Sequence, residues 1–258
     1  ARRMGIWIED TVRILGDDRQ LAWKETIAQR RSTERNPCGT PVVQKLSWAS
    51  PSHGIEQNMT KALIVVDVQP TFCEGGELGV AGGNAVAERI ARYVAEHRSE
   101  YAYIATTQDW HVDPGTHWSD QPDFVDTWPV HGKAGTPNAQ LHPAIAALRI
   151  EHHFKKGQYS PSYSGFEGYE DNTDRIATRV QAVDDARNAM TLPALDASEV
   201  TRIDVVGLAE SHCVKETALD AKKLGYEVHV IERLTEPVSE ELRVAAHRQM
   251  REAGVILD

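Results

Sequence analysis

The chain has 258 residues, of which 41% are hydrophobic and 26% are charged, a composition typical of a water-soluble globular protein. Its formal net charge of −10 argues against non-specific binding to nucleic acid phosphates or to an anionic membrane, because both require positive potential. Three scattered cysteines are too few for a disulfide framework, and no apolar run approaches the ~18 residues of a membrane span. We therefore expect a cytoplasmic protein that acts on a small molecule.

Residues 1–58 differ from the rest of the chain in charge and in pattern. They hold 9 Lys and Arg against 7 Asp and Glu, so their net charge of +2 leaves −12 for residues 59–258. The stretch 31–57 is rich in Ser, Pro, Thr, Asn and Gly and shows no sustained periodicity. We predict that residues 1–58 are an N-terminal extension, disordered or loosely structured, and that residues 59–258 form one folded domain. A regulatory or docking tail is the alternative for residues 1–58.

From Met59 onward, strand-like apolar runs alternate with helical patterns. The predicted strands are 62–67, 101–107, 151–155, 203–208, 226–231 and 255–257. The predicted helices are one capped by Asn84, one over 213–224, one capped by Ser239 that ends near Ala253, and an additional polar segment from Asp171 to about Met190. This alternation predicts an α/β fold with a doubly wound, mostly parallel sheet and helices on both faces.

Side chains suited to chemistry follow several of these strands. Asp67 ends the first strand, Asp109 and His111 follow the second, Lys156 follows the third, and Cys213 lies after the fourth. Ligands of such sheets bind outside the carboxyl ends of the strands, so we expect these residues to meet at one rim.

Cys213 is the strongest candidate for a nucleophile, because a helix N-terminus favours the thiolate and its N–H groups can hold an oxyanion. An acid could take the thiol proton, and a lysine could hold that acid ionised, which makes Asp67 and Lys156 a suitable pair. The alternatives are a small buried cysteine, a carboxylate in a helix cap or ion pair, and a solvated lysine. Cys38 and Cys73 lack a comparable setting.

A second cluster combines one carboxylate with three imidazoles. Asp109 and His111 face the same side of an extended backbone, and a Pro-Gly turn at 114–115 can bring His117 back toward them. His131 follows shortly after in the chain. This set suits one divalent transition metal, such as zinc, iron or manganese, with an open position for water. Structural histidines are the alternative reading.

Together these residues resemble the nicotinamidase/pyrazinamidase branch of the isochorismatase-like cysteine hydrolase family, over the chain from Ala62 to its end. The matching strings are VVDVQ at 65–69, FCEGG at 72–76, DWHVDPGTH at 109–117, WPVH at 128–131, KG at 156–157, YSGFEG at 163–168, VVGLA at 205–209 and HCV at 212–214. The resemblance implies hydrolysis of the nicotinamide carboxamide to nicotinate and ammonia through a cysteine thioester, with pyrazinamide as a further substrate.

The resemblance also implies a role for each matched residue. Asp67 would be the general base, Lys156 would stabilise it, and Cys213 would attack the carboxamide carbon. The N–H groups of Ala209 and Cys213 would form the oxyanion hole, after a cis Leu208–Ala209 peptide. The substrate walls would be Phe72 and Trp128, with Tyr163 and His212 beside them, and the metal ligands would be Asp109, His111, His117 and His131.

Two other readings stay open at this point. A related cysteine amidohydrolase acting on a carbamoyl or ureido compound would keep Asp67, Lys156 and Cys213 but would not need the full metal set. A non-catalytic metal-binding or thiol-sensing protein would have no reason to place an acid and a lysine beside Cys213. For the function that the resemblance implies, we expect nicotinamide as a small-molecule substrate, no nucleic acid or membrane partner, and a monomer or homo-oligomer.

Removal of residues 1–58 tests the predicted division of the chain. The shortened protein is expected to keep its hydrolytic rate and its Tm nearly unchanged, because the matched residues all lie after Met59. Kinetic assays and thermal unfolding of both forms measure this, and a large drop in either quantity would contradict the prediction.

Overall fold

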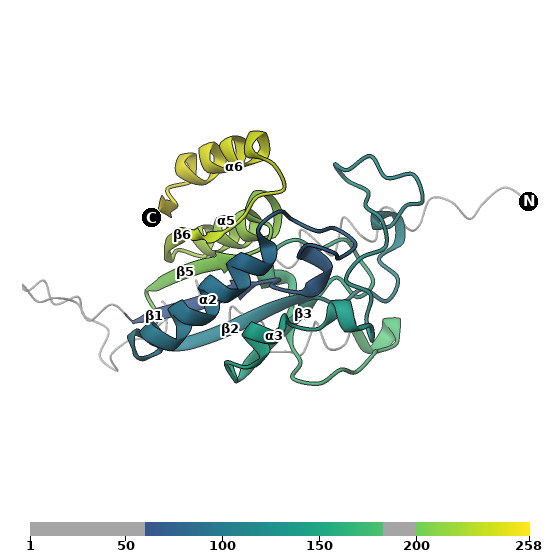
Figure 1. The fold of residues 1–258 in the computed structure, drawn as a ribbon, viewed down its shortest axis with the longest axis horizontal. Helices are drawn as coiled ribbons and strands as arrows, with labels where there is room; N and C mark the ends of the chain where they lie inside the picture. Colours follow the sequence, from purple (N-terminus) through teal and green to yellow (C-terminus); the bar gives the residue numbers. More distant parts are fainter. Residues whose placement is uncertain (1–59, 183–199) are drawn as a thin grey trace, which may run out of the picture. The chain divides into compact units, whose positions relative to one another are not determined.

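A central, mostly parallel sheet organises the computed structural model, which describes residues 60–182 and 200–258 (Figure 1). Within these residues seven strands form one sheet in the order β4-β3-β2-β1-β5-β6-β7. Every neighbouring pair is parallel except β3 and β4. The strands are β1 (Lys61–Val66), β2 (Tyr101–Asp109), β3 (His152–Lys156), β4 (Tyr169–Glu170), β5 (Arg202–Gly207), β6 (Glu227–Thr235) and β7 (Ile256–Leu257). The predicted doubly wound α/β class is confirmed.

Helices cover both faces of the sheet. The α-helices are α2 (Gly83–His97), α3 (Pro143–Ala146), α5 (Lys215–Lys223) and α6 (Glu240–Glu252). The shorter turns are η1 (Pro70–Phe72), η2 (Arg98–Glu100), η3 (Gly115–His117), η4 (Pro137–Ala139), η5 (Gly165–Glu167) and the π-helical turn η7 (Glu210–Val214). In the part of the chain that the structure describes, no helix has the length and apolarity that crossing a membrane requires.

The side chains of β1 alternate between two hydrophobic cores. Ala62, Ile64 and Val66 pack with residues of α5 and α6 on one face. Leu63 and Val65 pack with residues of α2 and α3 on the other. All five are fully buried, which explains the continuous apolar run in the sequence, since a strand covered on both faces has no polar side.

Several predicted boundaries shift in the structure. Asn84 is not the cap of α2: Gly82 occupies that position, and the carboxylate of Glu74 accepts hydrogen bonds from the N–H groups of Gly82 at 2.6 Å and Asn84 at 2.8 Å. The helix predicted from Cys213 begins as the π-helical turn η7, and α5 starts only at Lys215.

One predicted helix cap is confirmed, while the predicted segment from Asp171 lies partly outside the described residues. Ser239 does cap α6, because its hydroxyl accepts from the N–H of Leu242 at 3.3 Å. The polar helix predicted from Asp171 does not begin there, since residues 171–178 are irregular. Residues 179–182 are helical, and the part from 183 to about Met190 lies outside the described residues. The two-residue strand β4, antiparallel to β3, was not predicted because so short a strand leaves no alternation to detect.

Gly207 allows β1 and β5 to approach closely at their carboxyl ends. Its φ is 123°, and a Cβ at this position would lie 2.1 Å from the carbonyl oxygen of Val66. That same carbonyl accepts from the N–H of Leu208 at 2.8 Å. The contact places the residue after β1, Asp67, next to the chain that continues from β5 toward Cys213.

Replacement of Gly207 by alanine tests this contact. Gly207→Ala is expected to reduce the free energy of unfolding by more than about 3 kcal/mol, because two backbones must separate to admit the methyl group. Gly225→Ala is the matched control, since Gly225 also has a positive φ of 97° but nothing within 4 Å of the added Cβ. The control should lose only about 1–2 kcal/mol. Urea denaturation measures both, and equal losses would show that the close approach is unimportant.

Candidate active site

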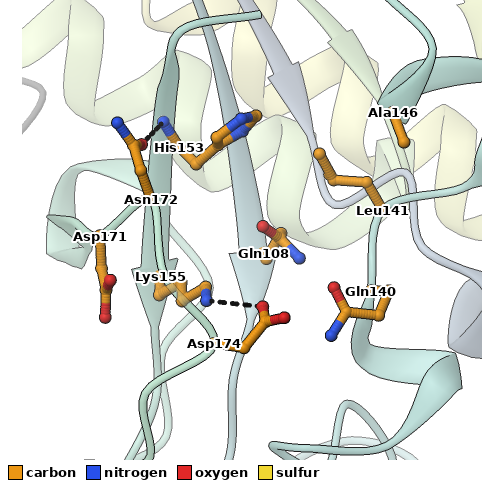
Figure 2. Close-up of a pocket in the computed structure, with 9 residues that line it drawn as sticks. All are labelled: Gln108, Gln140, Leu141, Ala146, His153, Lys155, Asp171, Asn172 and Asp174. Carbon is orange, nitrogen blue, oxygen red and sulfur yellow. Dashed lines mark hydrogen bonds and ion pairs between the residues drawn. The ribbon is translucent and has the colours of Figure 1, made fainter. Parts of the chain in front are cut away.

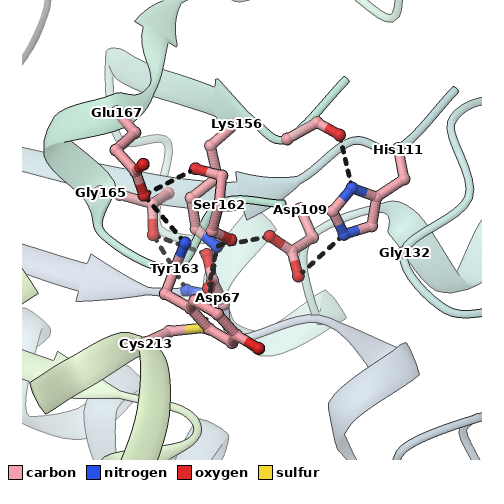
Figure 3. A network of polar contacts seen from close by, with 12 residues as sticks. Asp67, Asp109, His111, Gly132, Lys156, Ser162, Tyr163, Gly165, Glu167 and Cys213 are labelled. Carbon is pink, nitrogen blue, oxygen red and sulfur yellow. Dashed lines mark hydrogen bonds and ion pairs between the residues drawn. The ribbon is translucent and has the colours of Figure 1, made fainter. Parts of the chain in front are cut away.

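The carboxyl ends of three neighbouring strands and the turn after β5 bring four predicted residues together (Figure 3). The ammonium of Lys156, at the end of β3, lies 3.0 Å from Asp67 Oδ2 and 3.7 Å from Cys213 Sγ. It also donates to Oδ1 of Asp109, at the end of β2. All four side chains are buried. The rim expected from the strand order therefore exists, with Lys156 at its centre.

Asp67 is held by the neighbouring strand β2. Its backbone has a φ of 47°, a left-handed conformation that non-glycine residues rarely adopt. The Thr107 hydroxyl donates to Asp67 Oδ1 at 2.7 Å and accepts a hydrogen bond from the Asp67 backbone N–H at 3.2 Å. Sequence reasoning missed Thr107, although its place two residues before Asp109 on one strand puts both side chains on the same side.

A tight turn fixes a fourth contact of Lys156. Its ammonium donates to the carbonyl oxygen of Ser162 at 3.1 Å. The Glu167 carboxylate accepts from the Ser162 hydroxyl at 3.0 Å and from the N–H groups of Tyr163 and Ser164 at 2.9 and 3.0 Å. Figure 3 shows this turn folded around Glu167 beside Lys156. Glu167 thereby sets the position of an acceptor for the central ammonium.

The buried charges shift one another's pKa values. Burial raises the pKa of the Asp67 carboxyl, and the Lys156 ammonium only partly opposes this. For Asp109, burial is again the largest single influence and raises the pKa, but Lys156, His111 and His131 together outweigh it and hold the pKa of Asp109 well below its usual range. Burial alone would lower the pKa of Lys156, yet Asp109 and Asp67 raise it well above its usual value. Lys156 is therefore a permanent cation, and Asp67 is the stronger base of the two carboxylates.

The protonation state of Cys213 differs from the sequence-based expectation. Burial raises the pKa of the Cys213 thiol well above its ordinary value, and the nearby Lys156 ammonium does not reverse this. We expected a helix N-terminus to favour the thiolate, but Cys213 is 7% exposed and lies inside η7. Desolvation outweighs the helix dipole here, so the resting thiol is neutral and needs a base to activate it.

The predicted oxyanion residues lie in the same turn. The Leu208–Ala209 peptide is cis, and Ala209 directly precedes η7. The carbonyl of Ala209 accepts from the N–H groups of His212 at 3.0 Å and Val214 at 3.2 Å. Ala209 and Cys213 thus belong to one compact loop of backbone.

Three of the four predicted metal-binding residues form a buried cluster. The candidate ligand atoms of His111, His117 and His131 all lie within 4.8 Å of one another. Asp109 Oδ2 lies 3.4 Å from His111 Nε2 and 3.8 Å from His131 Nε2, while its other oxygen is taken by Lys156. Asp109 therefore lies between the histidine cluster and Lys156, and the sequence did not predict that it contacts both.

The hydrogen bonds of these imidazoles suit a metal site. His111 Nδ1 donates to the carbonyl of Gly157 at 2.5 Å, and His131 Nδ1 donates to the carbonyl of Pro129 at 2.7 Å. These bonds direct both Nε2 atoms inward, as outer partners of metal ligands do. His111 Nε2 and His117 Nδ1 are buried without a hydrogen-bond partner, and burial lowers the pKa of His117 to about 4. Buried imidazole nitrogens without a hydrogen-bond partner are available to bind a metal ion.

Aromatic side chains lie between the histidine cluster and Cys213. Trp128 Nε1 donates to the Tyr163 hydroxyl at 3.0 Å, and the Trp128 ring meets the His212 ring edge-on at 5.4 Å. Phe72 lies 5.9 Å from the His131 ring, measured between centroids. The four predicted wall residues therefore border the same region.

A cavity of about 210 Å³ lies beside β2 and β3, on the face away from the side chains of Asp109 and Lys156 (Figure 2). Its lining includes Gln108 and Lys155, whose side chains alternate with those of Asp109 and Lys156 along the strands. None of the predicted catalytic, metal or wall residues lines this cavity, so it is separate from the candidate active site.

The remaining described cysteine has no place in the site. Cys73 is 1% exposed and packs in the core under α2, where burial raises the pKa of its thiol to about 11. Cys38 lies outside the described residues.

Comparison with known proteins agrees with this geometry. The Isochorismatase domain family matches residues 61–181 and 188–257. The nicotinamidase/pyrazinamidase of Mycobacterium tuberculosis is 43% identical over 197 residues, covering 76% of this chain and 97% of that protein. The nicotinamidase of Escherichia coli is 32% identical over 213 residues, covering 76% and 93%.

Solved structures give the same result. PnC1 from L. infantum, in complex with nicotinate, is 31% identical with a TM-score of 0.61, covering 78% of this chain and 93% of that one. The pyrazinamidase of Pyrococcus horikoshii, in complex with zinc, is 27% identical with a TM-score of 0.58, covering 77% and 98%. The fold, the matched residues and these likenesses agree that the chain belongs to the isochorismatase family.

Proposed function

We propose that this protein is a nicotinamidase, which hydrolyses the carboxamide of nicotinamide to nicotinate and ammonia and also acts on pyrazinamide. The observation that carries the proposal is the buried contact of Lys156 with Asp67 and Cys213, beside a cluster of three histidines. Relatives named as nicotinamidases support the substrate, as does the related structure that holds nicotinate.

The first step forms the carbon–sulfur bond. Cys213 Sγ attacks the carboxamide carbon, and its proton passes to Asp67, whose raised pKa makes it a better base than an exposed carboxylate. Lys156 remains charged, and its ammonium, 3.0 Å from Asp67 Oδ2, stabilises the Asp67 carboxylate until Asp67 takes the proton. The carbonyl electrons move to the oxygen, which the N–H groups of Ala209 and Cys213 bind.

The second half of the reaction releases both products. The tetrahedral intermediate collapses, the carbon–nitrogen bond breaks, and the amine takes the proton from Asp67 and leaves as ammonia. Water then attacks the thioester carbon while Asp67 accepts its proton. The carbon–sulfur bond breaks, the proton on Asp67 returns to Cys213 Sγ, and the product leaves as nicotinate once its remaining proton has passed to solvent.

Asp109, His111, His117 and His131 would hold one divalent transition metal such as zinc, iron or manganese. The inward, unpartnered imidazole nitrogens and the Asp109 oxygen fit such an ion. When bound, it supplies a Lewis-acidic contact to the pyridine nitrogen, directly or through water, that orients the ring. Phe72 and Trp128 would sandwich the flat ring, with Tyr163 and His212 as further wall residues.

Ammonia release by the purified protein tests the proposed function. Wild-type protein is expected to release ammonia and nicotinate from nicotinamide, and Cys213→Ala should reduce turnover by at least about 10³-fold, because the nucleophile is lost. Cys73→Ser is the matched control and should keep the wild-type rate, since Cys73 lies in the core under α2. Chromatography of the products measures all three. Full turnover by Cys213→Ala would overturn the nucleophile, and hydrolysis only of a ureido or carbamoyl compound would overturn the substrate.

Gly157→Ala tests the metal site. A Cβ on Gly157 would lie 2.5 Å from His111 Cε1, so the imidazole must move away from its position. We expect the affinity for the metal to fall about 10–100-fold, the usual effect of disturbing an outer partner of a ligand. Chelator competition followed by elemental analysis measures this.

The control for that variant is Gly75→Ala. Gly75 also has a positive φ, 93°, but an added Cβ would meet nothing within 4 Å. Gly75→Ala should therefore carry the strain of alanine at a positive φ but keep the wild-type affinity for the metal. Equal metal affinity in both variants and the wild type would contradict the assigned role of His111.

A further inference from the structure

Glu210 is a fully buried carboxylate at the beginning of the turn that carries Cys213. It lies between Ala209 and the rest of η7. Its Oε1 accepts from His247 Nε2 at 2.5 Å, and its Oε2 accepts from the Thr235 hydroxyl. Arg243 Nε lies 3.7 Å from Oε1. A buried carboxylate without such partners would be strongly unfavourable, so these contacts fix where η7 can lie.

The partners come from elements outside the turn. Thr235 ends β6, while Arg243 and His247 lie on α6. The backbone adds to this attachment, because the Glu210 N–H donates to the carbonyl of Glu236 at 2.8 Å. The turn is therefore anchored to both β6 and α6 through one residue.

The side chain of Glu210 contacts a different region from that of Cys213. Glu210 bonds to β6 and α6, whereas Cys213 contacts Lys156 at the end of β3. The same short turn spans both contacts and begins at Ala209. A shift of Glu210 would therefore move Cys213 Sγ relative to Lys156 and would also move the N–H groups of Ala209 and Cys213.

We propose that Glu210, paired with His247, is a positioning residue that holds the Ala209–Cys213 turn in register with Asp67 and Lys156. It acts through the backbone of η7 and does not touch the substrate. This inference rests on the proposed function for its kinetic test. The expected signature is a larger loss in kcat than in affinity, because Phe72 and Trp128, which would sandwich the ring, lie on other segments and only the wall residue His212 moves with the turn.

Glu210→Gln is the main test. Glutamine keeps the volume but replaces one acceptor oxygen by an NH₂ group, so either His247 or Thr235 loses its acceptor. Because a displacement of about 1 Å at a reacting atom can cost about 100-fold in rate, we expect kcat for nicotinamide to fall about 10–100-fold, with KM changed less than about twofold. The rate at which iodoacetamide alkylates Cys213 should also differ between Glu210→Gln and the wild type. This measurement needs no substrate.

Asp204→Asn is the matched control. Asp204 is also a buried carboxylate with two partners, the Tyr101 hydroxyl at 2.8 Å and Arg202 Nε at 2.6 Å. It lies in β5, before the turn. This variant should lose folding stability comparably but keep the wild-type kcat and alkylation rate. His247→Gln should reproduce the kinetic effect of Glu210→Gln, and the double variant should be no slower than the slower single variant.

The outcomes separate the proposal from a purely structural role. If Glu210→Gln loses stability as Asp204→Asn does, yet keeps wild-type kcat and alkylation rate, the proposal is wrong. If Glu210→Gln does not fold, Thr235→Val removes one of its hydrogen bonds, and an unchanged kcat in that variant would also overturn the proposal. If wild-type protein releases no ammonia from nicotinamide, the proposed function fails, while the alkylation rates still decide the role of Glu210.

Discussion

The buried ammonium of Lys156 is the contact on which the site depends. It joins Asp67 after β1, Asp109 at the end of β2 and Cys213 after β5. One ammonium between the carboxylates of Asp67 and Asp109 leaves these three side chains with a net negative charge in a buried site. Asp109 directs its second oxygen toward the histidine cluster, where a divalent cation would offset that charge. The nucleophile half and the metal half of the site are thus linked through one carboxylate.

The sheet supports this contact by forcing strand ends together. β1 is buried on both faces, and Gly207 lets β5 approach Val66 more closely than any other residue would allow. Asp67 then leaves β1 in a left-handed conformation that the hydrogen bonds from Thr107 maintain. On the far side of Cys213, Glu210 attaches the same turn to β6 and α6. The backbone strain at Asp67 and the anchoring of the turn that carries Cys213 therefore come from opposite sides of one rim.

Sequence patterns predicted the sheet class and the meeting of Asp67, Lys156 and Cys213, because parallel strands present their carboxyl ends at one edge. They did not predict how Asp109 divides its oxygens between Lys156 and the histidines, since that depends on register and side-chain direction. The Glu210 and His247 pair was invisible for the same reason, as the two residues lie far apart in the chain.

Local rules also failed where burial competes with them. A helix N-terminus favours a thiolate, yet the buried Cys213 stays a thiol because desolvation dominates. Asn84 looked like a helix cap, but Glu74 satisfies the free N–H groups from outside the local pattern. The division of the chain at residue 59 stays a prediction, because residues 1–59 lie outside the described part.

In the proposed reaction, Cys213 carries the acyl group of the substrate between the two half-reactions. The most direct measurement mixes the protein with nicotinamide, quenches the reaction with acid within milliseconds to seconds, and analyses the digested peptides by mass spectrometry. We expect a nicotinoyl group on the peptide that contains Cys213, at a level that falls as substrate is consumed. Rapid ammonia release with no nicotinoyl adduct on Cys213, or with the adduct on another residue, would contradict it.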